Sequence, residues 1–174
     1  TGPGLATAMP FLADAKNAGV PLVVTVGQND SRMLQYEPQL SGNIMGMAQA
    51  VSKWCTEVYH TEDIPAVLHR AFKTAMQAPY GPVIISIPQN VMEPSINFEM
   101  REATTVYPRI RPDLDALEKA VSLIKKAKNP AIVVEGGVTK SGALEETVRF
   151  AEMIGASVHQ IWMTDVNFPV NHPQ

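Results

Sequence analysis

Two continuous apolar runs constrain the fold of this chain more than any other feature. Residues 21–27 (PLVVTVG) and 81–89 (GPVIISIPQ) are rich in β-branched residues and show no alternation of polar and apolar positions. Such runs are typical of strands buried on both faces, as in a parallel sheet. A segment with helical spacing lies between them, and parallel strands need a crossover of that kind. We therefore expect 21–27 and 82–88 to be neighbouring or near-neighbouring strands of one parallel sheet.

Helices are predicted on either side of the first run. Residues 5–19 have apolar side chains on one face and end at Gly19, although Pro10 predicts a kink or a late start. Residues 61–77 form a stronger helix, with Thr61 or Asp63 as its cap and Pro65 in its first turn. The stripe expected to enter the core consists of Val67, Leu68, Ala71, Phe72, Ala75 and Met76.

The second half of the chain repeats the alternation of helices and strands. Helices are predicted over 112–128 and 141–156, the latter capped by Ser141 and ended by Gly155. Residues 131–135 and 157–162 are expected to form a second parallel sheet. The fold class is thus α/β, with parallel sheets and flanking helices in two partial three-layer α/β/α domains. Each half has few elements, so apolar surface should remain for another chain or for further residues to cover.

A proline-rich stretch without periodicity divides the two halves. We predict a first partial domain over 1–97, a linker over 98–112 and a second partial domain over 113–174. The chain starts directly on a glycine turn and stops in a loop-like tail. We therefore expect a piece of a larger protein.

Composition excludes several classes of function. The 174 residues carry a net charge of −3, which gives no general attraction to nucleic acid or to anionic membranes. No apolar run approaches the length of a membrane span, and the single cysteine, Cys55, favours a reducing, cytoplasmic setting. The histidines at 60, 69, 159 and 172 lack metal-ligand spacing, with His159 expected to be packed. No nucleophile elbow or P-loop is present, so we assign no catalytic and no metal-binding residue.

Two glycine-rich stretches are candidates for ligand contact. Gly2 to Thr7 (GPGLAT) approximates a dinucleotide-binding turn, and Asp30 follows the next strand. That interpretation is weak because no strand precedes the turn and Pro3 lacks an N–H for a phosphate. Residues 134–143 (VEGGVTKSGA) form a second glycine turn, which either contacts a nucleotide or flavin or is an ordinary loop.

Several motifs in order resemble one enzyme family. Residues 1–28 (TGPGLATAMPFLADAKNAGVPLVVTVGQ), followed by SRML, VSKW, TEDIPAVLHRAFKTAM and GPVIISIP, resemble the pyrimidine-binding domain of thiamine-diphosphate-dependent enzymes. The stretches NPAIVVEGG and NFPVNHP resemble the first half of the central domain in the same enzymes. The likeness is to the group that holds benzoylformate decarboxylase and acetolactate synthase.

The resemblance implies roles for six residues. Pro3 would lie against the aminopyrimidine ring of thiamine diphosphate, and Gly2 and Gly4 would shape the turn. Thr7 falls where relatives often have asparagine, so a polar contact from it is in doubt. Gln39 and Leu40 match positions that line the substrate pocket in benzoylformate decarboxylase-like enzymes; the alternative is an ordinary surface loop.

The resemblance also implies an activity for the parent protein. It would be a lyase or transferase that uses thiamine diphosphate and Mg²⁺ to decarboxylate or ligate a 2-oxo acid, assembled as a dimer or homotetramer. FAD, which acetolactate synthase holds in its central domain, is a lesser candidate. The activating glutamate and the Gly-Asp-Gly diphosphate motif of the family are not in these residues, so we expect the isolated chain to be inactive. The alternative is a non-catalytic α/β module for assembly or for an adenine-containing ligand.

Overall fold

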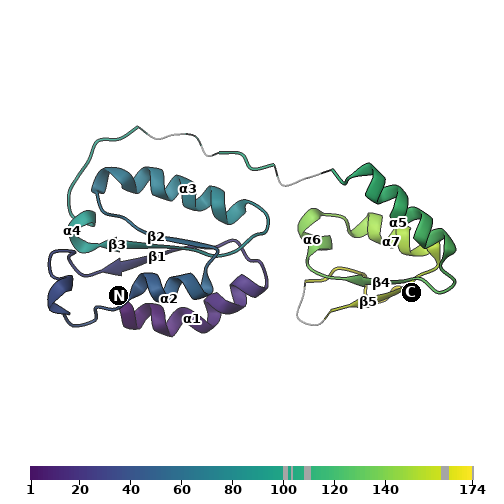
Figure 1. Ribbon diagram of the computed structural model, residues 1–174, viewed down its shortest axis with the longest axis horizontal. Helices are drawn as coiled ribbons and strands as arrows, with labels where there is room; N and C mark the ends of the chain where they lie inside the picture. The colour runs from purple at the N-terminus through teal and green to yellow at the C-terminus, as the bar shows by residue number, and fades with distance from the viewer. Residues whose placement is uncertain (100–101, 103, 108–110, 162–164, 174) are drawn as a thin grey trace. The chain divides into compact units, whose positions relative to one another are not determined.

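The chain forms two compact units. The computed structural model describes residues 1–99, 102, 104–107, 111–161 and 165–173. The units comprise Thr1–Pro108 and Arg109–Gln174 (Figure 1). Each has its own parallel sheet, as the α/β prediction required. The assignment of the two units to a pyrimidine-binding and a central domain stays a prediction.

A three-stranded parallel sheet organises the first unit. Its order is β1 (Val23–Gln28), β3 (Val83–Pro88), β2 (Trp54–Glu57). Val23 pairs with Val83, which confirms the predicted neighbours. The central strand β3 is buried along its whole length, whereas both outer strands are only partly buried. The central strand is therefore covered on both faces, and the two outer strands are partly exposed to solvent.

Helices cover both faces of this sheet (Figure 1). Helix α3 (Ile64–Met76) lies on one face, and α1 (Gly2–Asn17) and α2 (Ile44–Val51) lie on the other. Side chains of β3 alternate between the two cores: Ile84 packs with α1 and α2, and Ile85 packs with α3. The unit is thus a three-layer α/β/α arrangement.

Helix α1 differs from the prediction at its start. It begins at Gly2 rather than late, and Pro3 lies in its first turn, where the fixed φ of proline suits a helix and no N–H is needed. Pro10 lies inside the helix. Leu5 and Leu12, which precede and follow it in the helix, are both buried in one core cluster. The Gly-Pro-Gly stretch is therefore helical.

Of the two residues predicted as the cap of α3, Asp63 occupies that position and Thr61 does not. Asp63 occupies the N-cap without a side-chain hydrogen bond, and Thr61 lies in a short 3-10 turn (Thr61–Asp63). The Thr61 hydroxyl instead donates to the carbonyl of Val91, 2.7 Å away, in the short helix α4 (Gln89–Met92). The Thr61 hydroxyl thus donates in a tertiary hydrogen bond, where a cap would have accepted a bond from a backbone N–H of α3. Pro65 lies in the first turn of α3, as predicted.

The predicted apolar stripe of α3 is only partly buried. Ala71 and Ala75 are fully enclosed, whereas Phe72 and Met76 are 60% and 50% exposed. The sheet has three strands, so it covers only the inner part of the stripe. The outer part faces solvent.

A two-stranded parallel sheet forms the second unit. Strands β4 (Ala131–Val134) and β5 (Ser157–Gln160) pair as predicted. The helices of this unit are α5 (Leu114–Lys126), α6 (Gly137–Ser141) and α7 (Leu144–Ile154). Its buried core is small and centres on Val134, Ala151 and Phe168.

Much of the apolar surface of the second unit is open. Val133 pairs with His159 and is 63% exposed, and the prediction that His159 is packed is wrong because this face of the sheet has no helix over it among the described residues. Helix α5 buries none of its residues. The partial character predicted for this α/β domain is therefore evident.

Of the two end signals predicted for α7, the one at its carboxyl end is confirmed and the one at its start is wrong. Gly155 ends α7 with a φ of 62°, as expected for glycine after a helix. Ser141 is not the cap of α7. It ends α6, where its hydroxyl donates to the carbonyl of Gly137, 2.7 Å away. The stretch 134–143, predicted as a glycine turn, thus contains the short helix α6 at Gly137–Ser141.

Candidate site at the start of α1

The first turn of α1 presents a small uncharged surface. Pro3, Gly4 and Thr7 are exposed, whereas Gly2 and Leu5 are buried. Thr7 follows Gly4 by three residues and Pro3 by four, which places the exposed three on one side of the helix. The hydroxyl of Thr7 donates to the carbonyl of Pro3 at 3.0 Å, so it bonds back to the preceding turn of its own helix. We call Pro3, Gly4 and Thr7 the α1 platform.

A loop lies directly beside the platform. The N–H of Gly2 donates to the carbonyl of Leu40 at 3.1 Å. A Cβ added to Gly2 would lie 3.0 Å from the Cα of Gly42 and 3.0 Å from the carbonyl oxygen of Ser41. Only glycine permits this approach. The fold therefore brings the helix start and residues 38–42, which we call the pocket loop, into backbone contact.

Two side chains at the end of β1 hold the pocket loop. The amide of Gln28 donates to the carbonyl of Gly42 at 3.3 Å and accepts from the N–H of Asn29 at 3.0 Å. Asn29 Nδ2 donates to the carbonyl of Gln39 at 3.2 Å. Gln28 is 6% exposed, so its amide must be paired within the protein. The carbonyls of the pocket loop thus accept hydrogen bonds from the end of β1 and from the start of α1.

The pocket loop contains a strained residue. Leu40 has a φ of 67°, a region that side-chain-bearing residues rarely adopt. Gln39 and Leu40 are both exposed, with Leu40 at 51%. The hydrogen bonds to the carbonyls of Gln39, Leu40 and Gly42 offset that strain. The two predicted substrate-lining residues therefore lie beside the predicted cofactor-contacting turn.

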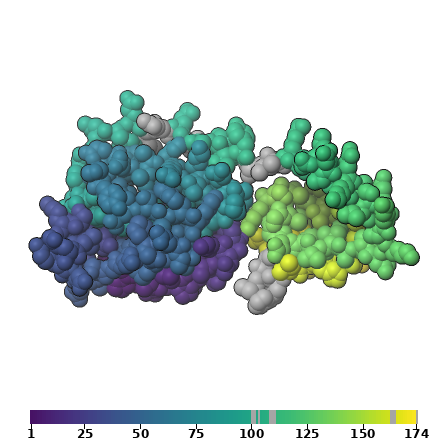
Figure 2. Space-filling view, in the orientation of Figure 1, coloured from purple at the N-terminus to yellow at the C-terminus, as the bar shows by residue number. Residues whose placement is uncertain are grey.

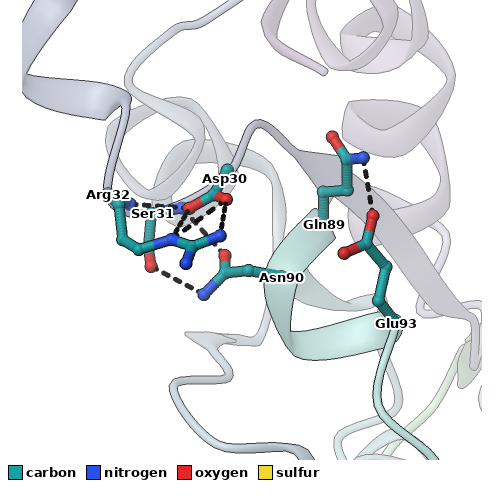
Figure 3. Close-up of polar contacts among 6 residues, drawn as sticks. All are labelled: Asp30, Ser31, Arg32, Gln89, Asn90 and Glu93. Carbon is teal, nitrogen blue, oxygen red and sulfur yellow. Dashed lines mark hydrogen bonds and ion pairs between the residues drawn. The ribbon is translucent and has the colours of Figure 1, made fainter.

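An ion pair follows the end of β1 (Figure 3). The guanidinium of Arg32 is bonded to both carboxylate oxygens of Asp30. The side-chain bonds from Arg32, with a further bond from its backbone N–H, hold the pKa of Asp30 below its usual value. Asp30 thus has a partner in the loop and is not positioned as a free ribose-binding acid.

The same loop is fixed to the end of β3. Ser31 N–H donates to Asn90 Oδ1 at 2.9 Å, and Asn90 Nδ2 donates to Ser31 Oγ at 3.0 Å (Figure 3). The neighbouring Gln89 bonds only within α4 in this network, to Glu93 at 2.8 Å. The side-chain amide of Asn90, in α4 directly after β3, therefore joins this helix to the loop after β1.

Other features of the described chain lie apart from this site. A cavity of about 810 Å³ is bounded by α3 and residues 92–99 and contains none of the six predicted site residues. Within the described ranges, no three His, Cys, Asp or Glu side chains are grouped as metal ligands. Helices long and apolar enough to cross a membrane are likewise absent from the part of the chain that the structure describes.

Three residues of this arrangement escaped the sequence analysis. Gln28 and Asn29 bond to the pocket loop, and Gly42 is the loop residue that approaches Gly2, yet the sequence assigned none of them a role. Gln28 is the last residue of the stretch 1–28 that resembles the pyrimidine-binding domain, and this was the only sign in the sequence that Gln28 has a role. Gly42 is in a loop, where glycine is common, so its close approach to Gly2 could be found only in three dimensions.

Comparisons with known proteins cover both units. Residues 117–174 match the model of the thiamine pyrophosphate enzyme central domain. The chain is 34% identical to the acetolactate synthase large subunit of Corynebacterium glutamicum, over 99% of this chain and 28% of the relative. Identity to isozyme 3 of the Escherichia coli large subunit is 27%, over 100% and 31%.

Two similar solved structures are described as a benzoylformate decarboxylase and a putative thiamin diphosphate-dependent enzyme. Benzoylformate decarboxylase from Polynucleobacter necessarius has a TM-score of 0.88 and 36% identity, over 99% of this chain and 33% of that structure. A structure from Mycobacterium smegmatis, described as that of a putative thiamin diphosphate-dependent enzyme, has a TM-score of 0.87 and 34% identity, over 99% of this chain and 34% of that structure. The chain thus spans about a third of the length of these relatives, and the resemblance inferred from the sequence is confirmed.

Proposed function

We propose that this chain, a relative of the thiamine-diphosphate-dependent enzymes in sequence and fold, supplies one wall of an aminopyrimidine and substrate site. The parent protein would act on a 2-oxo acid as a decarboxylase or carboligase. The α1 platform would contact the cofactor ring, and the pocket loop would contact the substrate through Gln39 and Leu40. The open sheets would serve as part of a homo-oligomer, a dimer or tetramer.

One observation carries the proposal. The Gly2 N–H to Leu40 carbonyl bond joins the turn expected to meet the cofactor to the loop expected to meet the substrate. These two segments are distant in the sequence, and the same family resemblance implies a role in one site for both. A shared site explains why they are held in backbone contact.

The residues of the platform suit an aminopyrimidine ring. Pro3 offers an exposed apolar ring, Gly4 adds no side chain, and no charged group belongs to the platform. A flat heteroaromatic ring packs well against such a surface, because neither partner has to desolvate a charge. Thr7 Oγ is already bonded to Pro3, so a polar contact with the cofactor from Thr7 is not proposed.

The cofactor would supply the chemistry, and the residues of this chain would supply binding and orientation. Thiamine diphosphate, when bound with Mg²⁺, supplies an electron sink for cleavage next to a carbonyl group. The described residues of this site would orient the ring and shape the space for the acid. The groups that activate the cofactor and hold its diphosphate would come from elsewhere in the parent protein.

The test uses the complete protein. Thiamine diphosphate is titrated by calorimetry in the presence of Mg²⁺, and CO₂ release is followed with pyruvate and with benzoylformate. We expect saturable binding and cofactor-dependent release from at least one acid. Absence of binding, or release that continues unchanged without the cofactor, would contradict the proposal.

A further inference from the structure

The pocket loop depends on side chains that do not line the pocket. Three of its carbonyls, those of Gln39, Leu40 and Gly42, accept hydrogen bonds from outside the loop. Gly2 supplies one through its backbone, and the other two come from the side chains of Gln28 and Asn29. Both side chains come from one point, the carboxyl end of β1.

We propose that Gln28 and Asn29 are positioning residues that set the substrate preference of the enzyme by fixing the backbone of the pocket loop. This inference rests on the proposed function, because it takes Gln39 and Leu40 as substrate-lining. Neither Gln28 nor Asn29 needs to touch the substrate. Their effect passes through the loop carbonyls.

The strain at Leu40 makes this dependence strong. A φ of 67° is unfavourable for leucine, so the loop relaxes if its external bonds are lost. The bonds of Gln28 and Asn29 lie on either side of Leu40, at Gly42 and at Gln39. Releasing either bond would let the side chain of Leu40 move, while the bond from Gly2 would still tie its carbonyl to α1.

The two amides are also bonded in series. Gln28 Oε1 accepts the Asn29 N–H at 3.0 Å, so the orientation of one amide fixes the backbone that carries the other. Gln28 is almost fully buried, which leaves its amide few alternative partners. Because both amides come from the carboxyl end of strand β1, the position of the end of β1 determines the position of the pocket loop.

Isosteric carboxylates separate hydrogen bonding from side-chain volume. Asn29→Asp keeps the shape but cannot donate to the Gln39 carbonyl, and Gln28→Glu likewise cannot donate to that of Gly42. Asn90→Asp is the matched control. It places the same charge in α4, directly after the neighbouring strand β3, where Asn90 contacts Ser31 and has no hydrogen bond to the pocket loop.

The first measurement is the ratio of kcat/KM for benzoylformate to kcat/KM for pyruvate, in the complete enzyme with thiamine diphosphate and Mg²⁺. We expect Asn29→Asp and Gln28→Glu to shift this ratio by about 3- to 10-fold, as loss of one hydrogen bond allows. Asn90→Asp should leave it unchanged. A uniform loss of activity with both acids, at an unchanged ratio, would indicate a merely structural role and overturn the inference.

The second measurement does not require turnover. Amide hydrogen exchange is compared for peptides that cover 38–43 and 83–88 in each variant. We expect exchange in 38–43 to accelerate by about tenfold in Asn29→Asp while β3 stays protected. Equal exchange in wild type and variant would overturn the inference even if the enzyme is active. An inactive wild type would instead refute the proposed function, and faster exchange would then show only that the loop is held.

Discussion

Gly2 and Gly42 approach each other so closely that neither can carry a side chain without moving the other. A Cβ on Gly2 would lie 3.0 Å from the Cα of Gly42, and a Cβ on Gly42 would lie 3.1 Å from the Cα of Gly2. We predict that Gly2→Ala lowers the free energy of unfolding by about 1–3 kcal/mol, because backbone must shift to admit the methyl group. Chemical denaturation of the protein measures this change.

Gly4→Ala is the matched control for that prediction. A Cβ at Gly4 meets only Thr1 Oγ1, at 3.9 Å, which is an ordinary contact. Since alanine favours a helix over glycine, this variant should be neutral or more stable by about 0.5 kcal/mol. Equal destabilisation by both substitutions would show that the Gly2–Gly42 contact is not the cause.

Pro3→Asp should weaken cofactor binding in the complete enzyme. A carboxylate against the aminopyrimidine would lose water without gaining a partner, and we expect the Kd for thiamine diphosphate to rise on the order of 100-fold. Pro3→Ala, which removes ring contact but adds no charge, should have a smaller effect. Both are measured by cofactor titration.

The stability of α1 provides the internal check on Pro3→Asp. An acidic residue in the first turn of a helix is favourable, so the substitution should not unfold the protein. Unchanged cofactor affinity in a folded Pro3→Asp variant would remove Pro3 from the site.

Lys53 caps the carboxyl end of α3, and its contribution should depend on pH. Its Nζ donates to the carbonyls of Thr74 and Gln77, the former at 2.7 Å. Lys53→Met retains the apolar stem but loses both bonds, which should cost about 1 kcal/mol of unfolding free energy near neutral pH.

The direction of the pH effect follows from the pKa. Burial lowers the pKa of Lys53 in the folded protein below 10.5. Between the folded value and 10.5 the unfolded chain therefore binds more protons, and the contribution of Lys53 to stability rises with pH. Denaturation of wild type and Lys53→Met at several alkaline pH values checks this. A difference between them that shrinks as pH rises would contradict it.

The strands and their pairing were predicted well, because runs of apolar residues and helical spacing can be recognised within short segments of the sequence. The apolar runs at 21–27 and 82–88 have no polar face, which predicted strands buried on both sides; this is correct for the central strand β3, whereas β1 is an outer strand and is only partly buried. The parallel pairing then followed from the helix between them. The same reasoning predicted β4 beside β5.

Single side chains were predicted less well, because their partners are set by tertiary structure. Thr61 had a helix end next to it, yet its hydroxyl bonds to Val91. Phe72 had the right spacing for a core residue, but the sheet does not extend under it. In the candidate site, the α1 residues and the pocket loop were each noticed, whereas the amides of Gln28 and Asn29 were not, since nothing in their spacing distinguishes a loop anchor from a surface amide.

The 174-residue chain alone should not turn over a 2-oxo acid. Its sequence contains no Gly-Asp-Gly stretch, and no carboxylate belongs to the α1 platform. We expect no CO₂ release from benzoylformate or pyruvate with thiamine diphosphate and Mg²⁺ present. Steady, cofactor-dependent turnover by the purified chain would contradict this division of the catalytic groups.

The most direct test of the account is a crystal structure of the complete protein with thiamine diphosphate and Mg²⁺, in which the contact between Pro3 and the aminopyrimidine ring is measured. The account predicts that the ring lies against Pro3 at about 4 Å, the distance of apolar contact, with Gln39 and Leu40 facing the same space. An aminopyrimidine bound elsewhere, with the first turn of α1 facing solvent or another subunit, would contradict it.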